Sequence, residues 1–272
     1  MALKDITLGQ YFPGNTLLHR LDPRTKLLFT VAYIVALFLA KHVVGYAVLF
    51  VLLAVLIAVS KVGIKSILRG MKPILIIVII TGLLNLFYTR GEGAPLVSFW
   101  IFTIYPEGIW AAVFMVLRIA MLITCTFLLT YTTSPILLTD GLESLLGPLK
   151  KIKVPVHELA MMMSIALRFI PTLIEETDKI MNAQKARGAQ LDTGKMTDRV
   201  KALVPVLIPL FISAFRRADE LAMAMECRCY RGGDGRTCLK VLRCEKQDYI
   251  DLAVCIACFA VILASRLVFP NF

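Results

Sequence analysis

The chain has 272 residues, 58% of them hydrophobic, with a mean hydropathy of +0.76 and a formal net charge of +11. A soluble domain of this length could not bury so many apolar side chains, so the composition predicts a polytopic membrane protein. The positive charge falls mainly in a few connecting segments. This favours cytoplasmic loops and argues against a nucleic-acid-binding protein, which would carry its Lys and Arg on a soluble domain.

Several apolar stretches are long enough, or nearly so, to cross a bilayer, which takes about 20 residues. Basic residues precede the first, follow the second and follow the fourth, so the positive-inside rule predicts a cytoplasmic N-terminus and an external C-terminus. We expect no signal peptide, because further spanning stretches follow the first one. The five stretches are 26–40, 43–60, 73–88, 108–131 and 250–269.

The expected architecture is an all-α polytopic membrane protein with about five transmembrane helices. Residues 1–131 hold an N-terminal segment and transmembrane helices 1 to 4, joined by an external loop at 89–107. Residues 132–247 form a cytoplasmic domain of three coupling helices, and residues 248–272 form the last transmembrane helix.

The cytoplasmic segment interleaves charged and apolar residues at helical spacing. Ser134 can cap the first helix, and Pro135 suits its first turn. A second helix follows Pro155, and a third runs from about Thr197 to Tyr230. Within the third, the apolar run 203–213 is short for a span, so a helix at the membrane interface is preferred over a sixth crossing, although both remain open.

Two short motifs, 186–188 and 227–229, place an arginine at the ends of the second and third helices. A single arginine there would be explained by the helix dipole. Two in equivalent places favour paired insertion into a twofold soluble partner, because guanidinium groups lock against carboxylates or carbonyls. At 1.5 Å per residue the third helix carries Arg228 roughly 45 Å from its own start, less any bend, which is too far for both arginines to share one small-molecule site.

The chain contains seven cysteines, an odd number that suggests no disulfide framework. Cys227, Cys229, Cys238 and Cys244 lie close in sequence, but their spacing matches no standard ligand pattern and no histidine is near, so we expect no metal site. The sequence also lacks a phosphate-binding loop, paired histidines and a nucleophile with an evident base, so we expect no enzyme. A membrane-bound enzyme using this cysteine cluster is the alternative function.

Two further features leave more than one interpretation open. Arg118 lies inside the fourth predicted span, where a charge either serves function or pairs with a neighbouring polar group for packing. Met161, Met162 and Met163 are either core filler or an adaptable contact surface for differently shaped partners.

Six stretches together resemble one known family along nearly the whole chain. The chain resembles the T component of energy-coupling factor (ECF) transporters (EcfT, related to the cobalt-transport protein CbiQ), the transmembrane scaffold of vitamin and metal-ion importers. The stretches are LHRLDPRTK (18–26), TTSP (132–135), LRFIP (167–171), AQKARGA (183–189), RADELA (217–222) and AMECRCY (224–230).

This resemblance implies a scaffold that holds two cytoplasmic ABC ATPase subunits and a membrane-embedded S component, which binds the substrate. The scaffold couples ATP hydrolysis to uptake in the cell membrane, and ATP and Mg²⁺ are bound by the ATPases, so this chain carries no cofactor. The family's paired Ala-Arg-Gly motifs dock into the ATPases, and here cysteines flank the second arginine, which predicts a slightly different helix end. The implied docking residues are Ala186, Arg187, Gly188, Cys227, Arg228 and Cys229, and the implied S-component surface is Met161, Met162, Met163 and Arg168.

Overall fold

The computed structural model describes residues 11–40, 42–88, 97–99, 102–189, 196–233 and 246–268. They fall into two compact units, which we consider separately. The bundle unit comprises the described residues of 9–141 and 242–272, and the paired-helix unit comprises those of 142–241.

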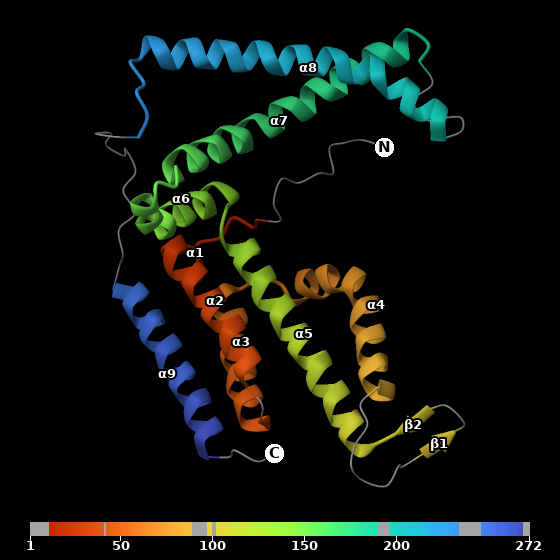
Figure 1. Ribbon diagram of the computed structural model, residues 1–272, viewed down its shortest axis with the longest axis vertical. Coiled ribbons are helices and arrows are strands. Elements are labelled where there is room, and N and C mark those ends of the chain that lie inside the picture. Colours follow the sequence, from red (N-terminus) through yellow and green to blue (C-terminus); the bar gives the residue numbers. More distant parts are fainter. Residues whose placement is uncertain are drawn as a thin grey trace. The chain divides into compact units, whose positions relative to one another are not determined.

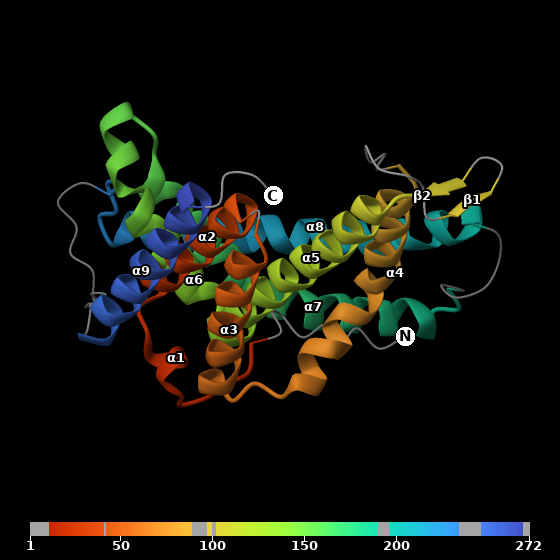
Figure 2. The same ribbon diagram turned by 90° about the horizontal axis from the view of Figure 1, so that it is seen from below.

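The bundle unit consists mainly of long apolar helices. In both views α9 lies along α2, and α4 lies along α5 (Figures 1 and 2). Its core is built where α2, α3, α5 and α9 meet, around the buried side chains of Leu37, Leu49 and Ile262. Its helices are α1 (Leu17–Arg20), α2 (Pro23–Leu39), α3 (Val43–Ser60), α4 (Ile64–Tyr88), α5 (Pro106–Thr132), the start of α6 (Pro135–Leu146) and α9 (Lys246–Val268).

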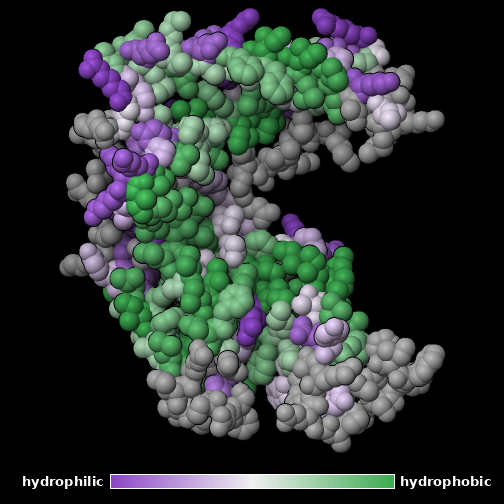
Figure 3. All heavy atoms as spheres, in the orientation of Figure 1, coloured by the Kyte–Doolittle hydropathy of each residue, from purple (hydrophilic) through white to green (hydrophobic). Residues whose placement is uncertain are grey.

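The outer surface of the bundle unit is apolar. Large hydrophobic side chains are exposed along its helices, and Figure 3 shows hydrophobic residues in green over much of the visible face. A soluble protein seldom exposes apolar patches of this extent, whereas lipid covers them without cost. The unit is therefore that of a multi-pass membrane protein, as the composition predicts.

Three helices are long and apolar enough to cross a membrane, or four if the bent α4 counts as one span, within the described residues. They are α3, α5 and α7 (Val156–Ala186), so two of the predicted spans qualify as unbroken helices. The first prediction, 26–40, corresponds to α2, which has only 17 residues. The prediction of about five spans is thus confirmed only as several spans, and α7, expected in the cytoplasmic segment, also qualifies by length and composition.

The third predicted span, 73–88, corresponds to the second part of α4. The helix itself begins at Ile64, and its two parts, Ile64–Met71 and Leu75–Tyr88, meet at an angle of 64°. Pro73 lies between them. Because proline lacks an amide hydrogen and clashes with the preceding turn, it kinks a helix instead of marking its beginning.

Within the described residues, the predicted all-α fold holds apart from one small hairpin. Strands β1 (Val97–Phe99) and β2 (Phe102–Ile104) pair antiparallel, with Val97 opposite Ile104. The hairpin falls in the loop expected at 89–107, where the sequence analysis considered only helices and loops.

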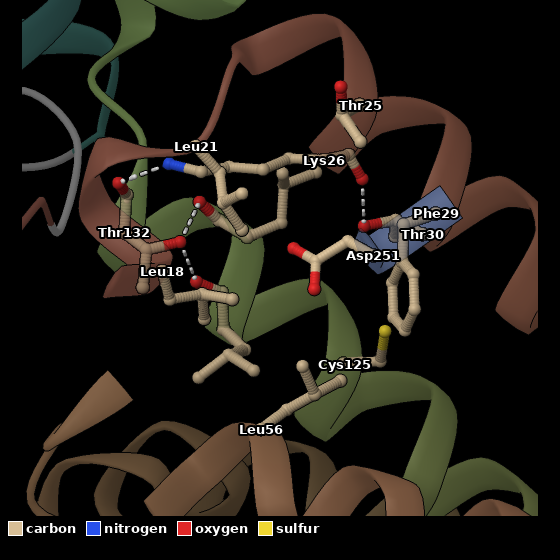
Figure 4. A pocket seen from close by; sticks show the side chains of 12 residues that line it. Leu18, Leu21, Thr25, Lys26, Phe29, Thr30, Leu56, Cys125, Thr132 and Asp251 are labelled. Atoms are coloured by element: carbon tan, nitrogen blue, oxygen red, sulfur yellow. Dashed lines mark hydrogen bonds between the residues drawn. The ribbon is translucent and has the colours of Figure 1, made fainter. Parts of the chain in front are cut away.

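A buried lysine joins the ends of several bundle helices. The side chain of Lys26 is only 7% exposed, and its amine donates hydrogen bonds to the carbonyls of His19 and Thr132 and to Oγ1 of Thr133, at 3.2–3.3 Å. Figure 4 shows the Lys26 side chain reaching Thr132. The start of α2 is thereby fixed to α1 and to the end of α5.

Asp248 attaches α9 to the same place. Its Oδ1 accepts a hydrogen bond of 2.9 Å from the backbone amide of Asp22, the N-cap residue of α2, whose own carboxylate caps the amide of Arg24. The LHRLDPRTK stretch therefore supplies a buried polar cluster that holds α1, α2, α5 and α9 together.

Arg118 makes contacts that favour the packing interpretation. Its Nε donates to the hydroxyl of Tyr46 at 2.8 Å, and its guanidinium donates to the carbonyl of Ala40, the C-cap of α2, at 3.4 Å. It also lies 5.7 Å from the ring centre of Phe38. A cation at a helix C-terminus is favourable, so Arg118 ties α5 to the turn between α2 and α3.

Replacing Lys26 tests the polar cluster. The variant Lys26→Met keeps the side-chain length but leaves three acceptors without their donor, so we expect the free energy of unfolding in detergent to fall by at least about 2 kcal/mol. The midpoint of thermal unfolding, followed by size-exclusion chromatography, should fall accordingly. The exposed Lys65→Met serves as control, and an unchanged midpoint for Lys26→Met would contradict the role of the cluster.

Candidate docking site

The paired-helix unit is built on two long helices that pack antiparallel. After α6 and the 3₁₀ helix η2 (Gly147–Ile152), α7 has 31 residues and α8 (Met196–Cys227) has 32. Glu176 near the middle of α7 accepts hydrogen bonds from Ser213 and Arg217 of α8. Further along α7, the side-chain amide of Gln184 donates to the carbonyl of Pro205. Later residues of α7 therefore lie beside earlier residues of α8, so the two helices run in opposite directions.

This packing places the two arginine motifs at opposite ends of the pair, as the ribbon in Figure 1 shows for the ends of α7 and α8. At 1.5 Å per residue each helix is about 46–48 Å long. Pro205 and Pro209 lie inside α8, where proline can bend a helix, so this length is an upper limit.

The first motif ends α7 in a tight cap. Arg187 is the C-cap residue, and Gly188 follows with φ +88°, in the left-handed region that glycine adopts freely. The amide of Gly188 donates to the carbonyl of Lys185, and that of Ala189 to the carbonyl of Gln184, both at 3.0 Å. This pair of hydrogen bonds defines a Schellman cap.

The second motif ends α8 with the same cap, although no glycine is present. Cys229 occupies the equivalent position with φ +56°. Its amide donates to the carbonyl of Glu226 at 2.8 Å, and that of Tyr230 to the carbonyl of Met225 at 3.0 Å. The flanking cysteines predicted a different helix end at the second motif, but the backbone of its cap matches that of the first. The cost is strain, since a residue with a Cβ loses about 1–2 kcal/mol in this conformation.

Both arginine motifs lie at the surface of the paired-helix unit. Ala186, Arg187 and Gly188 are exposed, as are Cys227, Arg228 and Cys229. Among the described residues, the side chains of Arg187 and Arg228 make no hydrogen bond or ion pair within the chain. Each guanidinium group keeps its five donors for another molecule.

An open groove brings together residues that the sequence analysis assigned to different surfaces. It has a volume of about 640 Å³ and lies between the first half of α7 and the end of α8. Met161 and Arg168, expected to face one partner, line it together with Arg228 and Cys229, expected to face another. Met162 and Met163 are about half exposed and are not part of its lining.

An exposed apolar surface on α8 was only partly recognised from the sequence. Large side chains of α8 that recur at intervals of one helical turn are 43–66% exposed, and Figure 3 shows hydrophobic residues over the middle of this helix. The sequence analysis predicted an interfacial helix at 203–213 but named no contact surface there. We call this surface the α8 stripe: Leu203, Val204, Leu207, Ile208, Phe211, Ile212 and Phe215.

The candidate metal ligands are only partly visible. The described part of the chain contains no group of three or more His, Cys, Asp or Glu placed to hold a metal ion. Cys227 and Cys229 are free and exposed, whereas Cys238 and Cys244 lie outside the described residues.

Comparisons with known proteins agree along almost the whole chain. The family model for CbiQ, a cobalt transport protein, matches residues 14–239. The energy-coupling factor transporter transmembrane protein EcfT of Clostridium kluyveri is 54% identical over 97% of this chain and 98% of its own length. Those of Ruminiclostridium cellulolyticum and Bacillus subtilis are each 51% identical, over 98% and 86% of this chain and 99% and 88% of their own lengths.

The apolar helices define the class, a multi-pass membrane protein. The comparisons define the family: this chain belongs to the EcfT/CbiQ family and is the transmembrane T component of an ECF transporter. The resemblance given by the six sequence stretches is thereby confirmed. The family is non-catalytic, which confirms that the chain is no enzyme and removes the alternative of a membrane-bound enzyme.

The strained cap of the second motif yields a prediction. Cys229→Gly removes the left-handed strain, so the amides of 229 and 230 should open less often, with hydrogen exchange slowed about fivefold for a gain of about 1 kcal/mol. Mass-spectrometric hydrogen exchange over 225–232 of the full chain measures this. Cys227→Ala, at the last residue of α8, is the control. Exchange in Cys229→Gly that is as fast as in the wild type, or faster, would contradict the strain.

Proposed function

We propose that Arg187 and Arg228 each dock into one of two cytoplasmic ABC ATPase subunits, and that α6, α7 and α8 are the coupling helices of this T component. The observation that carries the proposal is the repetition of one exposed arginine-bearing cap at opposite ends of an antiparallel helix pair. Two separated, equivalent tips fit a partner with two equivalent sites. The names of the relatives support the same partners, because an energy-coupling factor transporter requires a source of energy.

The coupling mechanism we infer is mechanical. Closure of the two ATPases upon ATP binding moves the tips of α7 and α8 relative to each other. The movement is carried along the helices because the Glu176 hydrogen bonds join them near their middles. The apolar surface that holds the S component is thereby reshaped, and the S component releases its vitamin or metal ion inside the cell.

The S component is expected to contact the α8 stripe together with Met162 and Met163. These side chains are apolar and exposed, as a surface in contact with a membrane-embedded partner must be. Exposed methionines adapt to differently shaped partners, which suits a scaffold serving several S components. The family resemblance also implies Met161 and Arg168 for this surface. Both line the groove next to Arg228.

The topology we propose has five spans, with the N-terminus and the paired-helix unit in the cytoplasm. The distribution of basic residues carries this orientation. We place α7 outside the bilayer despite its apolar composition, since its end bears the exposed Arg187 and its middle bears Glu176. ATP and Mg²⁺ belong to the partner ATPases, and this chain is proposed to bind no cofactor.

Removing both guanidinium charges tests the docking proposal. In Arg187→Gln/Arg228→Gln, co-purification of ATPases with the T component should fall about tenfold or more, because interface arginines of this kind contribute at least about 2 kcal/mol each. Substrate uptake by cells should be lost while the chain still inserts into the membrane. The matched control is Lys179→Gln/Arg216→Gln, which removes two exposed charges of the same helices. Wild-type uptake and co-purification in the first variant would reject the proposal.

Thiol labelling from outside the cell tests the topology. In a background without the native cysteines, an impermeant maleimide should label Tyr105→Cys but neither Lys61→Cys nor Lys153→Cys until the membrane is opened, because a charged reagent does not cross the bilayer. Lys179→Cys should behave like Lys153→Cys. Labelling of Lys179→Cys from outside would show that α7 crosses the membrane and would overturn the placement of Arg187.

A further inference from the structure

The end of α8 carries more positive charge than the docking motif alone. Arg168 of α7, Arg228 of the cap and Arg231 just beyond it all line the groove, and all three are exposed. The side chains of the three make no hydrogen bond or ion pair within the described part of the chain. No acidic side chain is among the lining residues, although the carboxylate of Glu158 lies close to Gly232, which is one of them.

The segment after α8 is held in place against the beginning of α7. Gly233 lies so close to His157 that an added Cβ would come within 2.5 Å of its ring. His157 in turn pairs with Glu143 at 2.7 Å. Since only glycine fits at 233, the backbone that carries Arg231 is fixed along one wall of the groove.

The rest of the lining is apolar and limits what can bind. Met161, Ile165 and Met225 contribute hydrophobic walls beside the guanidinium groups. The volume of about 640 Å³ falls within the range of about 300–1,000 Å³ that is usual for ligand-sized sites. A small inorganic anion would pair with the guanidinium groups but leave the apolar walls without a partner. A peptide segment with acidic and apolar side chains would pair with the guanidinium groups and cover the walls.

We propose that this groove binds an acidic, partly apolar segment of the ATPase subunit that docks at Arg228, with Arg168 and Arg231 forming ion pairs to its carboxylates. The inference rests on the proposed function, because continuity with Arg228 is what identifies the occupant. Arg168 thus belongs to the ATPase interface instead of the S-component surface. Anionic lipid headgroups carry the same charge as an acidic ATPase segment, so the experiment must separate these two ligands.

The test uses the complete T component co-expressed with its ATPases. In Arg168→Gln/Arg231→Gln, with Arg228 intact, the ATPases should still co-purify at low salt but should dissociate at lower NaCl concentrations, with affinity reduced about tenfold at physiological salt. The charge-preserving Arg168→Lys/Arg231→Lys should restore most of the binding, which distinguishes lost charge from misfolding. Arg216→Gln, an exposed arginine of α8 outside the groove, should behave as wild type.

Each outcome has a separate meaning. Wild-type salt resistance of Arg168→Gln/Arg231→Gln, together with loss of ATPases in Arg187→Gln/Arg228→Gln, would overturn the groove proposal and leave the docking proposal intact. If neither variant weakened binding of the ATPases, the groove proposal and the docking proposal would both be overturned. If the groove variant instead lost binding to phosphatidylglycerol vesicles without any change in ATPase retention, the groove would be a lipid site and the proposal would be wrong.

Discussion

The antiparallel packing of α7 on α8 is the constraint on which the rest of this account depends. It is fixed by the contacts of Glu176 with Ser213 and Arg217, and by Arg217 lying 5.8 Å from the ring centre of Phe169. Because the helices run in opposite directions, their C-terminal caps cannot be neighbours. The same packing brings Arg168 to Arg228, so one arrangement of two helices creates both the separated tips and the groove at one of them.

The two caps show how one backbone geometry can be reached with different residues. Gly188 adopts the left-handed conformation without cost, whereas Cys229 adopts it under strain. The two hydrogen bonds that close the cap are present in both cases and leave the arginine exposed. The cap requires a backbone conformation, and the side chain at that position decides only how stable the conformation is.

The sequence predicted local structure well where local chemistry decides it. Ser134 caps α6 by accepting from the amide of Leu137, and Gly188 ends α7, as their residue types indicated. The bend in α4 was not predicted, because the expected third span, 73–88, covers only the part of α4 after the bend. The roles of Lys26 and Asp248 could not have been predicted, since the two residues are more than 200 positions apart and meet only when α2 and α9 pack. The groove escaped prediction for the same reason, because it depends on which residues of α7 and α8 lie opposite each other.

The central claim is that both arginine tips are seated in ATPase subunits. Photo-crosslinking measures this most directly, with a photoreactive amino acid placed at Ala186 or at Cys227 so that both arginines remain. In the assembled transporter, irradiation should join each position to an ATPase subunit, and the crosslinks should disappear when the ATPases are not co-expressed. Crosslinks from either position to this chain itself or to lipid in the complete assembly would contradict the account.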